Sequence, residues 1–578
     1  MLHKRAACAS LAPSCGNRLR VQECKSLATE TIIFAMALAF LAVLLGGGVF
    51  VISSKAPEFA GHPKGLYVLF LAEMWERFSY YGMRALLIFY LTKHWLFDDG
   101  KANLIYGAYT SLVYITPLLG GYLADRYLGQ RKAVLFGGIL IAIGHFLLAV
   151  EGQGGQSDPM LAVFWLALSF IIVGTGFLKA SISVIVGQLY PRTDVRRDGA
   201  YTIFYMGINT GAAIGTILVG FLGETYGWRY GFGLAGVGML AGLVFFVLGR
   251  PLLLGRGEPP SAARLAQRVA GMKFEWFLYL LAFAGVAMIW ALVQLQAVVG
   301  WLLLASGVVM LLYILYEAMK LPRDDRHRIF AIIFLIALQP VFWGLFEQGG
   351  GSLNLFTDRY VDRAGVPASL FQSINPIYIV LLGPIFAWLW TVTGRRGLEP
   401  STPAKFGLAL LQVGFSFLVL VWGAKMAGVG NPTPVIFIFL IYLFQTTGEL
   451  CLSPVGLSAM NRLAPKFMAG LIMGAWFFAT AGGNFVAGLI GQAIGTEGVD
   501  AASGSAAKTL YLDAYSTIGW VTIGIGVVVL AVSFLVKRLM HLDTIADGDD
   551  LAGYREIGES EAAGVSPQRN TTPGTGTL

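Results

Sequence analysis

The first long apolar segment of the chain carries a stripe of charged and phenolic side chains. Six of them follow one another at alternating spacings of three residues and one: Glu73, Glu76, Arg77, Tyr80, Tyr81 and Arg84. In a helix that turns about 100° per residue, these spacings place the side chains on one face. Ionisable groups inside an apolar helix are costly, so the stripe indicates a functional site.

Three further charges lie deep in later apolar segments: Lys179, Glu347 and Glu449. When the segments at 275–294 and 296–317 are set aside, the charged segments are the first, fourth, seventh and tenth of twelve. This period of three is typical of nested three-helix repeats whose first helices line a central cavity. The alternative is that the charges only form structural ion pairs. This alternative accounts well for one isolated pair, but less well for charges that recur in every third segment.

The buried charges do not balance, because four carboxylates face three cations. One carboxylate therefore lacks a full partner in a cavity of low dielectric constant, where burial disfavours its ionised form. A carboxyl group that is neutral near pH 7 can carry a proton, so we expect protons to be the coupling ion. His145 lies inside a predicted span without an acidic neighbour, and we expect it to be packed rather than to relay protons.

The same cavity can bind a molecule with opposite charges at its two ends. Arg77 and Lys179 can hold a carboxylate, and Glu449 can hold an ammonium group. Polar and aromatic residues of the same segments can complete the pocket: Tyr80, Tyr81, Asn209, Trp343, Asn375 and Trp476. The pattern therefore favours a zwitterionic ligand.

The elements that position these residues are predicted to be membrane helices. Of the 578 residues, 56% are hydrophobic and 13% are charged, against roughly 25% charged in soluble domains. Spans of about 20 residues are predicted near 67–92, 103–124, 132–151, 160–189, 199–222, 229–249, 275–294, 296–317, 328–347, 369–393, 404–427, 434–457, 467–491 and 514–536. The sequence thus predicts an all-α membrane protein with fourteen transmembrane helices.

Basic residues in the predicted loops give the expected orientation. With the first span starting inside, twenty lysines and arginines fall in inside loops and seven in outside loops. This asymmetry follows the positive-inside rule and places both ends of the bundle in the cytoplasm. Because the net charge of +8 resides in these short loops, we expect no nucleic-acid partner. No cysteine or histidine cluster has the spacing of a metal site or catalytic centre, so we expect no metal, no cofactor and no enzymatic activity.

The two ends of the chain differ from its body. Residues 1–30 are basic and polar, and the apolar run 31–53 is interrupted by three glycines. This run could be an extra span, a signal peptide or the product of a misplaced start codon, and we leave the extension 1–63 unassigned. Residues 541–578 lack an apolar period and are predicted to be a disordered cytoplasmic tail.

Five motifs resemble those of one transporter family. Residues 73–82 read Glu-Met-Trp-Glu-Arg-Phe-Ser-Tyr-Tyr-Gly, similar to the E-x-x-E-R-F-x-Y-Y-G signature of the proton-dependent oligopeptide transporters of the major facilitator superfamily. Residues 204–211, 342–348 and 449–457 resemble the family's motifs in the fifth, seventh and tenth helices, and 121–132 resembles the superfamily's loop between helices 2 and 3. The resemblance runs from about residue 63 to 540.

The resemblance implies a fold and a division of the chain. The fold is a major facilitator fold with two six-helix bundles, at 64–250 and 328–540, that alternate between inward- and outward-open states. The segment 251–327 is a linker with an inserted two-helix hairpin, as in bacterial members. The implied activity is symport of di- and tripeptides with protons across the cell membrane, and we expect the protein to be a monomer in the lipid bilayer.

The resemblance also implies residue roles. Glu73, Glu76, Arg77 and Lys179 would couple protons to transport. Substrate would be bound by Arg77, Tyr80, Tyr81, Tyr114, Lys179, Asn209, Trp343, Asn375, Glu449, Ser453 and Trp476. Arg84 and Glu347 would form an extracellular gate, and Asp125 would steady the cytoplasmic loop.

The substrate is not fixed by the fold. Plant relatives carry nitrate and other small molecules, although they often lack the E-x-x-E-R cluster that this chain keeps. A carrier of another small zwitterion or anion is therefore the alternative. The histidine that animal members place in the second helix is missing here, so proton binding is expected to rest on carboxylates.

Overall fold

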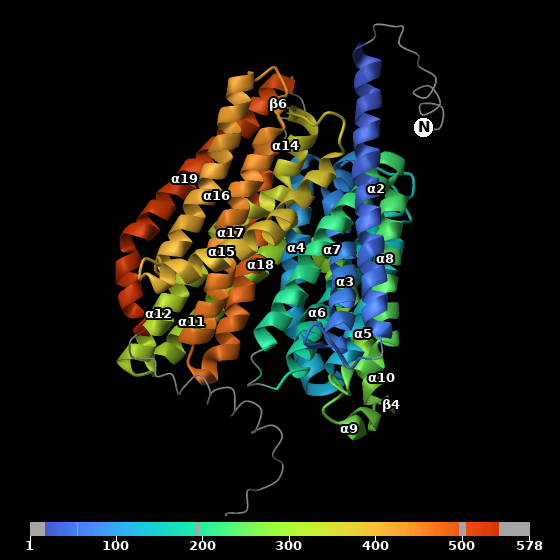
Figure 1. Cartoon of the computed structure of the whole chain (residues 1–578), viewed down its shortest axis with the longest axis vertical. Helices are drawn as coiled ribbons and strands as arrows, with labels where there is room; N and C mark the ends of the chain where they lie inside the picture. The colour runs from blue at the N-terminus through green and yellow to red at the C-terminus, as the bar shows by residue number, and fades with distance from the viewer. Residues whose placement is uncertain (1–17, 55, 192–193, 195, 496–503, 543–578) are drawn as a thin grey trace, which may run out of the picture.

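The computed structural model describes residues 18–54, 56–191, 194, 196–495 and 504–542. These residues form long helices arranged in two halves (Figure 1). The first half, blue to green, contains α3 (Lys64–Phe89), α4 (Asp99–Leu123), α5 (Gln130–Leu148), α6 (Leu161–Gln188), α7 (Arg197–Tyr226) and α8 (Trp228–Leu248). The second half, yellow to red, contains α12 (Arg323–Ala337), α13 (Gln339–Phe346), α14 (Ser352–Tyr360), α15 (Ile374–Arg395), α16 (Thr402–Ala427), α17 (Ile436–Leu463), α18 (Ala469–Ile494) and α19 (Gly504–Leu539).

The remaining elements are peripheral or short. The helices α10 (Phe274–Gln294) and α11 (Gln296–Met319) form the predicted hairpin, which follows the short α9 (Ala262–Ala266). Three two-residue strand pairs join loops: β1 (Glu58–Phe59) with β2 (His62–Pro63), β3 (Arg268–Val269) with β4 (Met272–Lys273), and β5 (Val361–Asp362) with β6 (Thr433–Pro434). In Figure 1, β6 and α14 lie at one end of the bundle and α9 and β4 at the other, so we name these the β6 end and the α9 end.

The prediction of an all-α membrane protein is confirmed. Thirteen described helical segments are long and apolar enough to cross a membrane, and twelve of them coincide with predicted spans. The other two predicted spans are the helices α3 and α4. They fall outside the thirteen because α3 carries the charged stripe and α4 is rich in Tyr, Gly, Thr and Ser, which lower its hydropathy.

Three predicted boundaries were wrong. The last span was predicted to begin at 514, but α19 begins at Gly504. The loop predicted after residue 347 contains the helix α14, so that Arg323–Tyr360 reads as one interrupted span. The span predicted to end at 457 continues as α17 to Leu463 although Pro454 lies inside it. Proline is tolerated in membrane helices because neighbouring groups satisfy the freed backbone atoms.

The apolar run at 31–53 belongs to the helix α2 (Arg18–Ser53). Along α2, the ring of Phe34 lies 4.6 Å from that of Phe221 on α7, and a Cβ at Gly48 would lie 2.7 Å from the Leu71 side chain of α3. The residues on its opposite side, such as Met36 and Phe50, are exposed. This arrangement agrees with the interpretation of residues 31–53 as an extra membrane span.

The two halves pack closely at the β6 end. There α4 and α18 approach through glycines: a Cβ on Gly107 would lie 2.7 Å from the Cα of Gly488. The Ser111 hydroxyl donates across the same interface to the Ala481 carbonyl at 2.8 Å. The β6 end is therefore a closed end of the interface between the halves.

Candidate functional site

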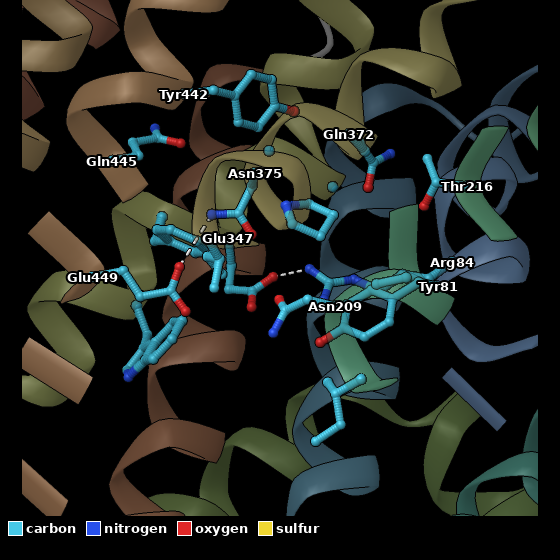
Figure 2. A pocket seen from close by; sticks show the side chains of 18 of the residues that line it. Tyr81, Arg84, Asn209, Thr216, Glu347, Gln372, Asn375, Tyr442, Gln445 and Glu449 are labelled. Carbon is cyan, nitrogen blue, oxygen red and sulfur yellow. Dashed lines mark hydrogen bonds and ion pairs between the residues drawn. The ribbon is translucent and has the colours of Figure 1, made fainter. Parts of the chain in front are cut away.

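A cavity of about 200 Å³ lies between the two halves. Figure 2 shows side chains from both halves pointing into it. Its lining from the first half consists of Tyr81, Arg84, Tyr114, Tyr205, Ile208, Asn209, Ala212 and Thr216. Its lining from the second half consists of Trp343, Phe346, Glu347, Gly349, Gly350, Gln372, Asn375, Pro376, Ile379, Tyr442, Gln445 and Glu449. Charged residues at three of the four predicted segments thus converge here, while α6, which carries Lys179, contributes no residue to the lining.

An ion pair between the halves closes the cavity toward the β6 end. The guanidinium of Arg84 on α3 pairs with the carboxylate of Glu347, and its Nε donates to the Tyr106 hydroxyl. Glu347 begins a 3-10 turn, Glu347–Gly350, where α13 ends, and this turn directs its carboxylate across the interface. A second cross-half pair lies at the same end, where Arg359 Nη2 donates to Asp99 Oδ1 at 2.7 Å.

Glu449 presents a carboxylate to the cavity from the second half. The Asn375 amide donates to its Oε2 at 3.1 Å and to the Thr446 hydroxyl at 3.0 Å (Figure 2). Within the described chain, no lysine, arginine or histidine nitrogen lies within 4 Å of this carboxylate. Its charge is therefore left for a ligand to neutralise.

The cluster at the start of the stripe is internally paired. Arg77 Nε lies 2.8 Å from Glu73 Oε1 and 3.1 Å from Glu76 Oε2. Both carboxylates are buried, with 1% and 0% exposure, and neither Glu76 oxygen has a hydrogen-bond partner among the described residues. Close packing of α7 on this turn of α3 depends on Gly211, where a Cβ would collide with the Met74 carbonyl.

Lys179 on α6 is placed next to the cavity but outside its lining. Its Nζ lies 3.7 Å from the centre of the Tyr114 ring, and Tyr114 lines the cavity. No carboxylate oxygen of the described residues lies within 4 Å of that ammonium group. The first half thus offers an unpaired cation opposite the unpaired Glu449 of the second half.

The other predicted site residues divide into two groups. Tyr81, Asn209, Trp343 and Asn375 line the cavity. By contrast, Arg77, Tyr80, Ser453, Trp476 and Asp125 do not.

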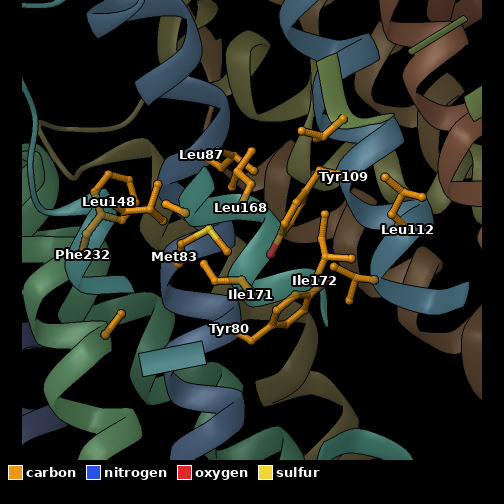
Figure 3. Packing of buried hydrophobic residues seen from close by; sticks show 14 of the residues in the cluster. Tyr80, Met83, Leu87, Tyr109, Leu112, Leu148, Leu168, Ile171, Ile172 and Phe232 are labelled. Carbon is orange, nitrogen blue, oxygen red and sulfur yellow. The ribbon is translucent and has the colours of Figure 1, made fainter. Parts of the chain in front are cut away.

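Three residues of the second group lie elsewhere in the structure. The Tyr80 ring is 2% exposed and packs among the apolar side chains of the first half, near Tyr109 and Ile172 (Figure 3). Trp476 is 5% exposed and packs against Phe406, with ring centres 6.3 Å apart. Asp125 is exposed in the turn after α4, where it accepts a hydrogen bond from Gln130 at 2.9 Å.

Several lining residues were missed by the sequence analysis, notably Tyr205, Gln372, Tyr442 and Gln445. Two of them carried a usable signal. Gln445 and Tyr442 precede Glu449 by four and seven residues, the spacing that puts side chains on one helical face. Gln372 had no such signal, because it belongs to the 3-10 turn Ala368–Ser373 before α15.

His145 is packed as expected. It is fully buried on α5, and neither ring nitrogen has a hydrogen-bond partner among the described residues. In the same part of the chain, no group of three or more His, Cys, Asp or Glu side chains could hold a metal ion.

Known proteins resemble this chain in sequence and in architecture. A model of the POT family matches residues 131–502. The uncharacterized transporter YclF of Bacillus subtilis (strain 168) is 37% identical over 497 residues, which cover 83% of this chain and 96% of the relative. The peptide transporter YePEPT of Yersinia enterocolitica is 37% identical over 474 residues, which cover 76% of this chain and 90% of the relative.

Solved structures agree with these matches. A mutant of a peptide transporter POT in complex with alafosfalin is 35% identical, with a TM-score of 0.71, and the match covers 84% of this chain and 97% of that one. A POT family transporter in complex with 5-aminolevulinic acid is 31% identical, with a TM-score of 0.70, over 84% of this chain and 99% of that one. This chain therefore belongs to the POT family of membrane transporters and has its major facilitator fold.

Proposed function

We propose that this transporter carries di- and tripeptides together with protons across the cell membrane. The observation that carries the proposal is the pair of unpartnered opposite charges at the cavity, Lys179 beside Tyr114 in one half and Glu449 in the other. A free peptide has a carboxylate at one end and an ammonium group at the other, so it neutralises both charges at once. Relatives named as a peptide transporter and a di-/tripeptide transporter support the substrate class.

The two peptide ends are assigned to different halves. Lys179 takes the carboxylate, assisted by Arg77, and Glu449 takes the ammonium group with Asn375 orienting its carboxylate. Tyr81, Tyr114, Asn209 and Trp343 surround the peptide backbone and side chains. Ser453 follows Glu449 by one helical turn, and we place it with Tyr80 and Trp476 among the residues that shape the pocket when the halves move.

The proton is assigned to the cluster on α3. Glu76 has no hydrogen bond to break when it is protonated, whereas Glu73 accepts one from Arg77 at 2.8 Å. Protonation of Glu76 removes one negative charge from the pair that surrounds Arg77. The guanidinium is then freer to assist Lys179 with the peptide carboxylate, which links proton uptake to substrate binding.

Transport proceeds by alternating access between the halves 64–250 and 328–540. The halves are held together at the β6 end, where Arg84 pairs with Glu347, and we infer that the cavity opens toward the α9 end. We place the α9 end, with its basic linker and the Asp125 turn, in the cytoplasm. The segment 251–327 then links the halves through the peripheral hairpin, and no second copy of the chain is needed for the cavity.

A second candidate substrate is another small zwitterion. The observation that favours it is the related structure in complex with 5-aminolevulinic acid, a molecule that also carries a carboxylate and an amine. Both candidates are tested by uptake of radiolabelled dialanine into proteoliposomes with an inward proton gradient. Accumulation that unlabelled dialanine suppresses more strongly than 5-aminolevulinic acid supports the peptide; the reverse order supports the second candidate.

The proposed orientation predicts which loops are reached from outside the cell. In a chain whose four cysteines are replaced by serine, Asp362→Cys in β5 should react with an impermeant maleimide on intact cells. Arg264→Cys on α9 should react only after permeabilisation, because α9 lies at the opposite end. Labelling of position 264 on intact cells would contradict the orientation.

The ion pair between the halves is predicted to act as a gate. Arg84→Glu places two carboxylates against each other, so the closed β6 end should be destabilised and dialanine uptake should fall at least tenfold, since breaking a buried pair costs about 3–5 kcal/mol. The exchange Arg84→Glu with Glu347→Arg should recover part of the uptake. A double variant as inactive as the single one, at equal membrane abundance, would show that Arg84 has a role other than pairing.

A further inference from the structure

A second cavity, of about 300 Å³, lies within the second half at the α9 end. It is lined by the ends of α15, α16, α17 and α19, and none of its lining residues belongs to the central cavity. Its polar wall contains Trp390, Glu399, Lys405, Ser458 and Arg462. The proposed transport steps use none of these side chains, so transport does not explain why charged and polar groups line this cavity.

Lys405 is an unusual component of this wall, because it is only 5% exposed. Its Nζ lies 4.1 Å from the centre of the Trp390 ring and pairs with the Glu399 carboxylate. The Glu399 side chain is itself 40% exposed, so the ion pair sits at the mouth of the cavity. The interior wall is thus formed by an ammonium group held over an indole.

Two donors of the wall have no acceptor in the described chain. The indole Nε1 of Trp390 is buried without a hydrogen-bond partner. Arg462 is exposed, and no carboxylate oxygen of the described residues lies within 4 Å of its guanidinium. The buried indole donor costs free energy that an acceptor from outside the chain can recover.

The charge around the cavity is also unbalanced. Arg395 and Arg396, at the end of α15, are exposed in the same α15–α16 connection that carries Glu399. Within the lining itself, Lys405 and Arg462 set two cations against the single carboxylate of Glu399. Basic pockets between helices near a membrane surface suit anionic headgroups, and guanidinium and ammonium groups bind phosphate oxygens with charge-assisted hydrogen bonds.

We infer that this second cavity binds a phosphate group, with the phosphate accepting from Trp390 Nε1, Lys405 and Arg462. The phosphate can belong to an anionic lipid or be free in solution. In the proposed orientation the α9 end faces the cytoplasmic leaflet, whose surface is negatively charged. Occupation would tie α15, α16 and α17 together at the end where the second half must move.

The test is thermal unfolding of the purified full-length transporter in detergent, titrated separately with phosphatidylglycerol, phosphatidylcholine and inorganic phosphate. Trp390→Phe removes the indole donor and keeps a ring under Lys405, and Arg462→Gln removes one charge. Arg256→Gln is the matched control, because Arg256 is exposed in the basic linker after α8. Unfolding of each variant without added ligand shows whether it folds as the parent does.

Phosphatidylglycerol should raise the unfolding temperature of the parent and of Arg256→Gln. Half-saturation should need about tenfold more lipid in Trp390→Phe and Arg462→Gln, as expected for one lost charge-assisted hydrogen bond. A response to inorganic phosphate alone, weakened by the same two variants, would support the site with free phosphate as its ligand. Equal responses in all variants, or equal responses to phosphatidylcholine and phosphatidylglycerol, would overturn the inference.

Discussion

Replacing Glu76 by Gln is expected to abolish peptide accumulation driven by a proton gradient while preserving peptide exchange. Glutamine has the shape of a protonated glutamate but cannot release the proton. Glu76 is fully buried and neither of its oxygens is hydrogen-bonded in the described chain. The substitution therefore breaks no hydrogen bond among the described residues, although it removes the negative charge that lies 3.1 Å from Arg77 Nε. The Arg77–Glu73 contact of 2.8 Å remains available. Net symport should therefore fail for lack of proton movement and not for lack of a fold.

The measurement compares two assays on the same proteoliposomes. With an inward proton gradient, Glu76→Gln should fill the lumen only to the outside dialanine concentration. In exchange against internal unlabelled dialanine, it should transport at a rate close to that of the parent and depend less on pH. Glu73→Gln is the comparison, because it weakens the hydrogen bond from Arg77 and should also lower the exchange rate. Accumulation by Glu76→Gln that matches the parent would exclude Glu76 as the proton carrier.

The convergence of the buried charges could be predicted from the apolar pattern, whereas the pairing of Arg84 with Glu347 could be predicted only from the family resemblance. The helix positions of Glu347 and Glu449 follow from the apolar pattern, and the period of three places both on the cavity. Their environments differ because of the cross-half packing: Glu347 meets Arg84, whereas Glu449 meets the neutral Asn375. Such contacts depend on the relative placement of two bundles, and a hydropathy pattern carries no information about it.

The edges of a helical face were equally hard to predict. Tyr80 and Tyr81 both belong to the stripe, and their ring centres lie 5.1 Å apart. Neighbouring residues nevertheless diverge by about 100° around a helix, so Tyr81 lines the cavity while Tyr80 enters the core of the first half. Only the helices packed around α3 decide which of the two borders the cavity.

The double substitution Lys179→Ala with Glu449→Gln is expected to stay inactive although each change compensates the charge of the other. If the two residues hold opposite ends of one peptide, each single change removes a charged partner of the substrate. The loss of such a partner costs about 2–5 kcal/mol. The affinity for the peptide should therefore fall by about thirtyfold or more. The double variant loses both partners, so restoring the net charge of the cavity should not restore transport.

The alternative is that Lys179 and Glu449 pair with each other in another conformation and only stabilise it. In this structure Lys179 lies over Tyr114 and Glu449 accepts from Asn375, so the two make no ion pair here. A purely structural pair would predict recovery of proton-driven dialanine uptake in the double variant, because neither charge is then left buried alone. Surface abundance and unfolding temperature are measured alongside uptake, with Lys425→Ala as a control at a cation distant from the cavity lining. Recovered uptake would refute direct binding of the peptide ends. A folded but inactive double variant supports it, because the partners of Lys179 and Glu449 are then the two ends of the substrate and not each other.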